Sequence, residues 1–335
     1  MVRDSLIRRL GLFVRRHYWD GALAALCLGA VVLGGPSAVS GFALLADRMV
    51  PGIAPPVMQV QGEEGSAGVP LLGFGASHHN PTVLFPLTAR AMPAWLRGKP
   101  EGVPASASLA HGPVIALCID DLGENLTGTA AAIALPREVA LAFLPYADGT
   151  SFMAERGFAR GHEILAHVPM QAFGPEDPGP MALRLGLADN DARLSWSLAR
   201  VPHLIGVNNH EGSKFTADAA AMRGVMQILA QRRLFFFDSR TSGMTKGEDV
   251  AHEIGIPSAG RDIFLDDTVS AEEVTRQLAA LEAKARRDGV AIAIGHPHDI
   301  TLKLVAAWLA QNHGVKLVPL TQAMALKRAK QIASR

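Results

Sequence analysis

The sequence predicts an α/β fold in which parallel strands alternate with covering helices, either as a barrel or as an open doubly wound sheet. Unbroken hydrophobic runs, typical of strands buried on both faces, alternate with amphipathic helical stretches over roughly 220 residues. Five of these runs stop at Asp, Asn or His, and the chemistry of α/β barrels lies where parallel strands end. With 335 residues, 49% of them hydrophobic, the chain suits one large domain with appendages.

The individual elements follow from these runs. Strands are predicted over residues 114–119, 163–167, 204–210, 235–238 and 291–296. Helices are predicted over residues 217–233, 270–287 and 301–312, where apolar residues recur three to four positions apart. Ser270 and Glu273 form a predicted capping box at the start of the second of these helices. Because parallel strands end on one rim, the side chains that follow the five strands are expected to gather there.

The N-terminal region is predicted to anchor the chain in the inner (cytoplasmic) membrane. A basic tail, residues 1–20, precedes residues 21–46, which carry no charged side chain and can cross the ~30 Å hydrocarbon core as a helix. The arginines favour a cytoplasmic tail, a single pass and a domain that is periplasmic or extracellular. One alternative is a cleaved signal peptide, broken at Gly34-Gly35-Pro36, which would release the domain; another is a buried helix of a soluble protein.

Composition predicts the bounds of the linker and of the folded domain, and it argues against two classes of protein. Residues 47–110 are rich in Pro, Gly, Ala and Ser and are predicted to form a flexible linker, so the folded domain should cover residues 111–330. The net charge is +1 and no basic face dominates, which argues against nucleic acid as a partner. The two cysteines, Cys27 and Cys118, lie in apolar surroundings and do not indicate a disulfide framework.

Asp120 and Asp121 follow the first predicted strand. Buried carboxylates need water, a cation or strong donors, so an adjacent pair is difficult to explain as core. One interpretation is that either aspartate caps the helix that follows. The other is functional: side chains of neighbouring strand residues point apart, so one aspartate would hold a metal ion while the other handles a proton.

Histidines follow three of the strands. His162 and His167 are five residues apart and therefore lie on opposite faces of a strand; His167 is the better ligand candidate, and His162 is a turn residue or a support for the ligands. Asn209 and His210 belong to a polar stretch that is either an ordinary turn or part of the site. Asp121, His167 and His210 together form a nitrogen and oxygen ligand set with room for water, which suits catalytic zinc.

Charged groups also follow the remaining strands. Asp238 with Arg240, and Arg261 with Asp262, are charged pairs that form either structural ion pairs or a site in which Arg240 or Arg261 orients the catalytic carboxylate. Asp266 and Asp267 are interpreted most simply as solvated or capping residues. His296 is the candidate general acid, because histidine is easily poised as a proton donor near neutral pH, and His298 is a candidate supporting residue beside it.

Five motifs taken together resemble a known family. The runs IDDLG, GHEILAHVPMQ, GVNNHEGSKFT, FFFDSRTS and IGHPH occur in this order, over residues 113–330, and are similar to the divergent polysaccharide deacetylase family, a branch of the NodB-type carbohydrate esterases. The resemblance implies a distorted (β/α)7 barrel, one divalent metal ion, usually zinc, and hydrolysis of an acetamido group on an envelope carbohydrate.

The resemblance also implies roles for individual residues. Asp120 matches the catalytic base, Asp121 and His167 match metal ligands, and His296 matches the histidine that protonates the leaving amine. The second histidine of the NodB metal motif would fall at Gln171, so His210 is expected to be the third ligand. Two other functions remain open: a tethered glycan- or protein-binding module without activity, and a metal-dependent hydrolase of another bond.

Overall fold

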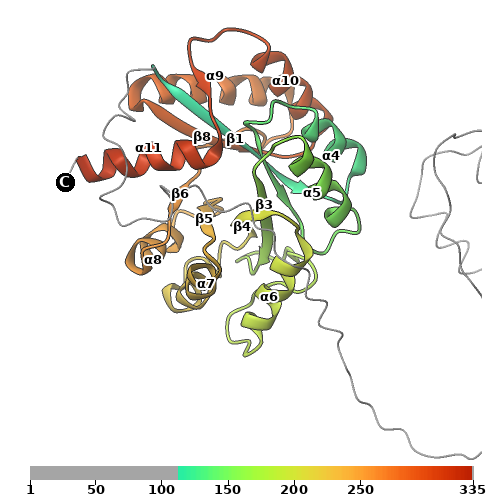
Figure 1. The fold of residues 1–335 in the computed structure, drawn as a ribbon, viewed down its shortest axis with the longest axis vertical. Coiled ribbons are helices and arrows are strands. Elements are labelled where there is room, and N and C mark those ends of the chain that lie inside the picture. Colours follow the sequence, from blue (N-terminus) through green and yellow to red (C-terminus); the bar gives the residue numbers. More distant parts are fainter. Residues whose placement is uncertain (1–111, 334–335) are drawn as a thin grey trace, which may run out of the picture. The chain divides into compact units, whose positions relative to one another are not determined.

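The computed structural model describes residues 112–333 as one curled, parallel β-sheet surrounded by helices (Figure 1). Its strands are β1 (Val114–Leu122), β2 (Ala140–Phe143), β3 (Ile164–Met170), β4 (Leu204–Glu211), β5 (Phe235–Asp238), β6 (Ser258–Gly260), β7 (Ile263–Phe264), β8 (Val290–Gly295) and β9 (Lys316–Leu317). Its helices are α4 (Leu126–Ile133), α5 (Thr150–Ala159), α6 (Asn190–Arg200), α7 (Ala219–Arg232), α8 (Gly247–Ile254), α9 (Ala271–Asp288), α10 (Asp299–Leu309) and α11 (Leu320–Ala333).

The sheet order is β6-β5-β4-β3-β2-β1-β8-β7, and β9 pairs with β1. Every recorded pairing is parallel, which confirms the predicted α/β class. The edge strands β6 and β7 do not pair with each other in the described part of the chain, although only two residues separate them. The strands therefore form a curled sheet that is left open at β6 and β7, and not a barrel closed by hydrogen bonds.

The sheet separates two hydrophobic cores. Residues on one face of the strands pack against the helices α4 to α10, and residues on the other face pack against Leu320, Ala323 and Met324 of α11. Side chains two positions apart in a strand point to the same face of the sheet. On the face that packs against α11, apolar residues lie earlier in the strands and polar residues follow them. The polar residues that continue the α11-facing set two positions further on are Asp120 after Cys118, His167 after Leu165 and His296 after Ile294.

The predicted helices are confirmed with small changes in their bounds, as α7, α9 and α10. Ser270 caps α9, since its hydroxyl accepts a hydrogen bond from the backbone N–H of Glu273 at 3.1 Å. The predicted basic tail (1–20), membrane anchor (21–46) and linker (47–110) lie outside the described residues. Within residues 112–333, no helix is both long enough and apolar enough to cross a bilayer.

Candidate functional site

The two aspartates of β1 converge on one histidine because the strand is irregular there. The pairing of β1 with β2 shifts register between Ile119 and Leu122, and Asp121 has a φ of 54°, in the left-handed region. This bulge turns Asp121 toward the side that Asp120 already faces. Nε2 of His167 consequently lies 3.2 Å from Asp121 and 3.7 Å from Asp120. The expectation that the two carboxylates point apart, based on regular alternation, is wrong.

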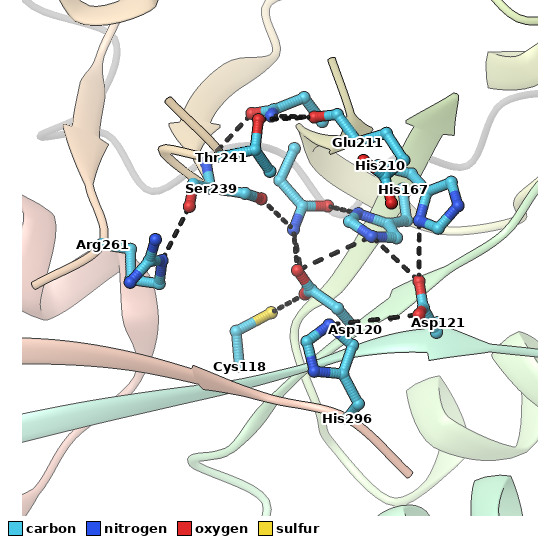
Figure 2. Close-up of polar contacts among 12 residues, drawn as sticks. Cys118, Asp120, Asp121, His167, His210, Glu211, Ser239, Thr241, Arg261 and His296 are labelled. Atoms are coloured by element: carbon cyan, nitrogen blue, oxygen red, sulfur yellow. Dashed lines mark hydrogen bonds and ion pairs between the residues drawn. The ribbon is translucent and has the colours of Figure 1, made fainter. Parts of the chain in front are cut away.

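Asp121, His167 and His210, on β1, β3 and β4, form a three-residue cluster (Figure 2). Oδ1 of Asp121 lies 3.2 Å from Nε2 of His167 and 2.9 Å from Nδ1 of His210. One possible ligand atom from each residue lies within 4.8 Å of the others.

The cluster fits a zinc ion by its chemistry and by one unsatisfied atom. Oδ1 of Asp121 is buried, and no group of the described residues gives it a contact with hydrogen-bond geometry, although ring nitrogens of His167 and His210 lie 3.2 and 2.9 Å away. Such an atom is costly to bury unless a cation or a donor meets it. Two imidazoles and a carboxylate are ligands that zinc accepts, and three protein ligands leave a coordination position for water. The residues present therefore fit the metal that the sequence predicted.

The charges within the cluster support one another. Burial disfavours the carboxylate of Asp121, but its contacts with His167 and His210 outweigh burial and hold the pKa of Asp121 well below its usual range. Burial also disfavours the charged form of His167, yet the carboxylates of Asp120 and Asp121 raise the pKa of that histidine. Asp121 is thus kept as an anion, the form that binds a metal ion.

Asp120 is buried behind this cluster and is held by neutral donors. Nδ2 of Asn208 lies 2.9 Å from each of its carboxylate oxygens, and the thiol of Cys118 donates to Oδ1 at 3.2 Å. Neither predicted arginine makes this contact. Arg261 donates to the backbone carbonyls of Ser239 and Arg240, while Arg240 pairs with Glu248. The alternative in which an arginine orients the carboxylate directly is therefore not what the structure shows.

His296 is joined to a residue that the sequence analysis missed. Nδ1 of His296 lies 2.9 Å from Oδ1 of Asp266, whose Oδ2 accepts from the His296 backbone N–H and the Thr301 hydroxyl, each at 2.8 Å. Nε2 of His296 faces the cluster, 4.0 Å from Asp121 (Figure 2). Asp266 is 3% exposed, so its interpretation as a solvated or capping residue is wrong. The missed signal is the run Ile263-Phe264-Leu265 before Asp266, the same pattern of an apolar run followed by a polar residue that marked the other strands.

The pairing with Asp266 sets the charge of His296. Burial disfavours the imidazolium form, but the hydrogen bond to Asp266 and the nearby carboxylates outweigh it and raise the pKa of His296 to about 9. His296 is thus kept protonated at neutral pH, as a general acid must be before it acts.

Five other predicted residues lie away from the cluster's contacts. Gln171 accepts from the backbone N–H of Leu185 at 3.0 Å and ties down the loop after β3. Exposed His298 precedes α10, with its ring centroid 6.2 Å from that of His296. The remaining three are held as follows: Asn209 accepts from Ser239 N and donates to Glu211 O, Asp238 accepts from Arg240 N and the Thr245 hydroxyl, and His162 contacts two backbone carbonyls.

His162 lies at the opposite end of the sheet. Its Nδ1 is 2.8 Å from the carbonyl oxygen of Val139, and its Nε2 is 3.0 Å from that of Ile133. A cavity of about 540 Å³ lies beside it, lined also by His203 and Lys316, and by no residue of the Asp121 cluster. The interpretation of His162 as a support for the metal ligands is therefore wrong.

Comparisons with known proteins show which family the chain matches. Residues 117–324 match the model of a family described as divergent polysaccharide deacetylase. An uncharacterized protein of Haemophilus influenzae is 39% identical over 198 residues, which are 58% of this chain and 70% of that protein. The uncharacterized protein YibQ of Escherichia coli is 33% identical over 193 residues, 57% of this chain and 60% of that protein. The crystal structure of uncharacterized protein ATU2773 from Agrobacterium tumefaciens is 32% identical with a TM-score of 0.61, and the match covers 64% of this chain and 90% of that one.

Proposed function

Because the chain belongs to the divergent polysaccharide deacetylase family, as its motifs predicted, we propose that it is a zinc-dependent hydrolase that removes an acetyl group from an N-acetylated sugar of the cell envelope. The observation that carries the proposal is the convergence of three chemically distinct parts on one rim. They are the possible ligand set of Asp121, His167 and His210, the buried carboxylate of Asp120 and the pair of His296 with Asp266.

Each part has a task in amide hydrolysis. Asp121, His167 and His210 would hold the ion, which supplies Lewis acidity toward the acyl oxygen and toward water. Asp120, 3.7 Å from Nε2 of His167, would accept a proton from the attacking water.

The second proton transfer belongs to His296. Asp266 holds Nδ1 of His296, so that Nε2 faces the cluster and can give its proton to the leaving nitrogen. The two proton-transfer groups therefore come from different strands and from different environments: a buried carboxylate with neutral donors, and an imidazole paired with a carboxylate.

The test compares two aspartates in the zinc-loaded, full-length chain. Asp120→Asn should keep the zinc content and the fold while it slows acetate release from short N-acetylated amino-sugar oligomers by about 10²–10⁴, the usual worth of a positioned proton acceptor. His296→Ala should slow the same reaction to a similar extent. Asp238→Asn is the matched control, because Asp238 is also a buried aspartate at a strand end but makes no contact with the cluster.

The outcomes separate an enzyme from a binding module. Rates unchanged by both Asp120→Asn and His296→Ala would remove these residues from the mechanism. A wild-type chain that binds zinc and releases no acetate from any acylated amine would instead favour the alternative of a tethered glycan- or protein-binding module.

The proposed location depends on the segment before the domain. The arginines of residues 1–20 and the uncharged stretch 21–46 support an anchor with the domain outside the cytoplasm. Reporter fusions placed after Gly65 should be active only when the reporter works in the periplasm or outside the cell. A reporter signal confined to the cytoplasm would contradict the location and leave the proposed chemistry untouched.

A further inference from the structure

Asn208 lies between the proposed base and one of the proposed metal ligands. It is on β4, it is fully buried, and its Cα is in register with that of His167 on the neighbouring strand β3. Residues in register on parallel strands point to the same face, so the carboxamide of Asn208 starts beside the ring of His167. No part of the reaction proposed above assigns it a role.

The carboxamide uses both of its ends. Its Oδ1 lies 2.9 Å from Nδ1 of His167. Its Nδ2 lies 2.9 Å from both carboxylate oxygens of Asp120 and 3.2 Å from the hydroxyl of Ser239. A buried amide with its oxygen and its nitrogen both engaged is fixed in orientation as well as in position.

Hydrogen-bond chemistry determines which end of the Asn208 carboxamide is the oxygen and which is the nitrogen. An ionised carboxylate only accepts, so the NH2 group must face Asp120, and a flipped amide would place its oxygen against two carboxylate oxygens. The amide oxygen then faces His167 and only accepts, so Nδ1 of His167 must carry a proton. The nitrogen of His167 that faces Asp121 is Nε2, which offers its lone pair to a metal ion when the ion takes the place of its proton.

We infer that Asn208 is the positioning residue of this site: one carboxamide fixes the metal-binding tautomer of His167 and the plane of the Asp120 carboxylate at the same time. The inference deepens the proposed function and rests on it for the roles of these two partners. The proposed ligand His167 and the proposed base Asp120 both depend on the carboxamide of Asn208. A change at Asn208 should therefore affect both metal affinity and turnover.

No other side chain in the described residues duplicates this support. The thiol of Cys118 donates to Asp120 at 3.2 Å but does not reach His167. Arg261 makes hydrogen bonds to backbone carbonyls, as described above. Removal of the Asn208 amide therefore leaves Nδ1 of His167 without its acceptor and leaves only the thiol as a side-chain donor to Asp120.

Two substitutions of Asn208 separate its two contacts in the full-length chain. Asn208→Ala removes both and should weaken zinc affinity about 10–100-fold, the usual cost of losing a group that orients a ligand, and lower kcat by about 10² or more with KM little changed. Asn208→Asp keeps an acceptor for His167 but turns an acceptor toward Asp120. It should keep zinc affinity within about threefold of wild type and still lower kcat by about 10².

A third measurement needs neither metal nor turnover. In the metal-free chain labelled with [15N]histidine, the Nδ1–H of His167 should give a slowly exchanging proton signal. That signal should be lost in Asn208→Ala and kept in Asn208→Asp. Asn209→Ala is the matched control, because Asn209 is the next residue and is buried, but its contacts go to Ser239 N and Glu211 O.

The inference is overturned if Asn208→Ala equals Asn209→Ala in zinc affinity and in the His167 signal. It is also overturned if Asn208→Asp loses zinc as completely as Asn208→Ala while remaining folded by circular dichroism. If Asn208→Asp does not fold, Asn208→Ala decides alone. A wild-type chain that binds zinc without hydrolysing any substrate contradicts the proposed function, whereas the zinc affinity and the His167 signal still decide the role of Asn208.

Discussion

His162 and His167 stand five residues apart, His162 just before β3 and His167 within it, and they have opposite surroundings. Both are buried, 2% exposed each. The ring nitrogens of His162 contact two backbone carbonyls, of Val139 and Ile133, which are neutral and belong to the frame of the fold. Those of His167 face the amide of Asn208 and the carboxylates of Asp120 and Asp121.

The difference shows what separates a structural histidine from a reactive one. Residue type and burial are the same, so neither can distinguish the two. The partners distinguish them: backbone carbonyls tie a ring into the fold, whereas carboxylates that share one ring nitrogen create a site where a cation is favourable. Position agrees with this, because His167 lies toward the carboxyl ends of the parallel strands and His162 precedes the start of β3.

Removal of the His167 ring and removal of the His162 ring should have opposite consequences. His167→Ala removes a proposed ligand, so the variant should bind no zinc at concentrations that saturate the wild-type chain, with a smaller effect on folding. His162→Ala should do the reverse: keep zinc and lose about 1–3 kcal/mol of unfolding free energy, because the carbonyls of Val139 and Ile133 lose contact with a ring that donates, when neutral, to one of them. Metal analysis and urea unfolding of both variants measure this, and equal zinc loss in the two would contradict the division of roles.

A second pair of residues repeats the comparison at the two ends of β7. Asp262 precedes this strand and pairs with Lys327 at 2.6 Å, whereas Asp266 follows it and pairs with His296 at 2.9 Å. Asp266→Asn should keep zinc and lower kcat by about 10², because Asp266 orients the proposed acid. Asp262→Asn should leave kcat within about twofold, because Asp262 makes no contact with the reacting groups.

Asp266→Asn should also shift the pH dependence of kcat in a definite direction. The charge of Asp266 favours the imidazolium of His296 and raises its pKa, so Asp266→Asn lowers that pKa. A reaction that needs protonated His296 then loses its activity at lower pH, and the alkaline limb of the profile moves toward acid. An alkaline limb that stays in place while kcat falls would mean that Asp266 does not act through His296.

The main strands could be predicted from the sequence because parallel strands that are buried on both faces consist of unbroken runs of apolar residues. The runs that became β1, β3, β4, β5 and β8 were all recognised, as were α7, α9 and α10. The short strands β2, β6, β7 and β9 were not, since two to four residues carry too little pattern to separate a strand from a loop. The sheet is open between β6 and β7 because β6 pairs with β5 and β7 pairs with β8. No local pattern in the sequence encodes these pairings.

The site was predictable in its residue types but not in its geometry. Asp121, His167, His210 and His296 were singled out because polar side chains follow apolar runs. The convergence of Asp120 and Asp121 was not, because it depends on a bulge with a positive φ at Asp121. Asp266 was missed because its strand, β7, has only two residues, and the support of Asp120 by Asn208 depends on contact between β1 and β4.

The prediction with the least consequence for zinc concerns Gln171, the position at which the sequence resemblance places the second histidine of the NodB motif. Its Oε1 accepts from the backbone N–H of Leu185 and not from any group of the cluster. Gln171→Ala should therefore cost about 0.5–1.5 kcal/mol of unfolding free energy and leave zinc affinity unchanged. Gln171→His restores the motif in sequence only, because the side chain at this position is directed to the loop after β3.

A double variant makes this last prediction decisive. If His210 is the third ligand, His210→Ala should lose zinc, and adding Gln171→His to it should recover none, because the new imidazole starts from a position whose side chain faces Leu185. Zinc affinity of each variant, measured by competition with a chelator, tests this. Recovery of tight binding in the double variant would show that the loop after β3 rearranges, and that the ligand set of the NodB relatives is within reach of this chain. Without recovery, the difference between the two positions is one of direction: the backbone just after β3 directs the side chain of Gln171 to the loop, and β4 directs that of His210 to the cluster, and a substitution at one position does not change this.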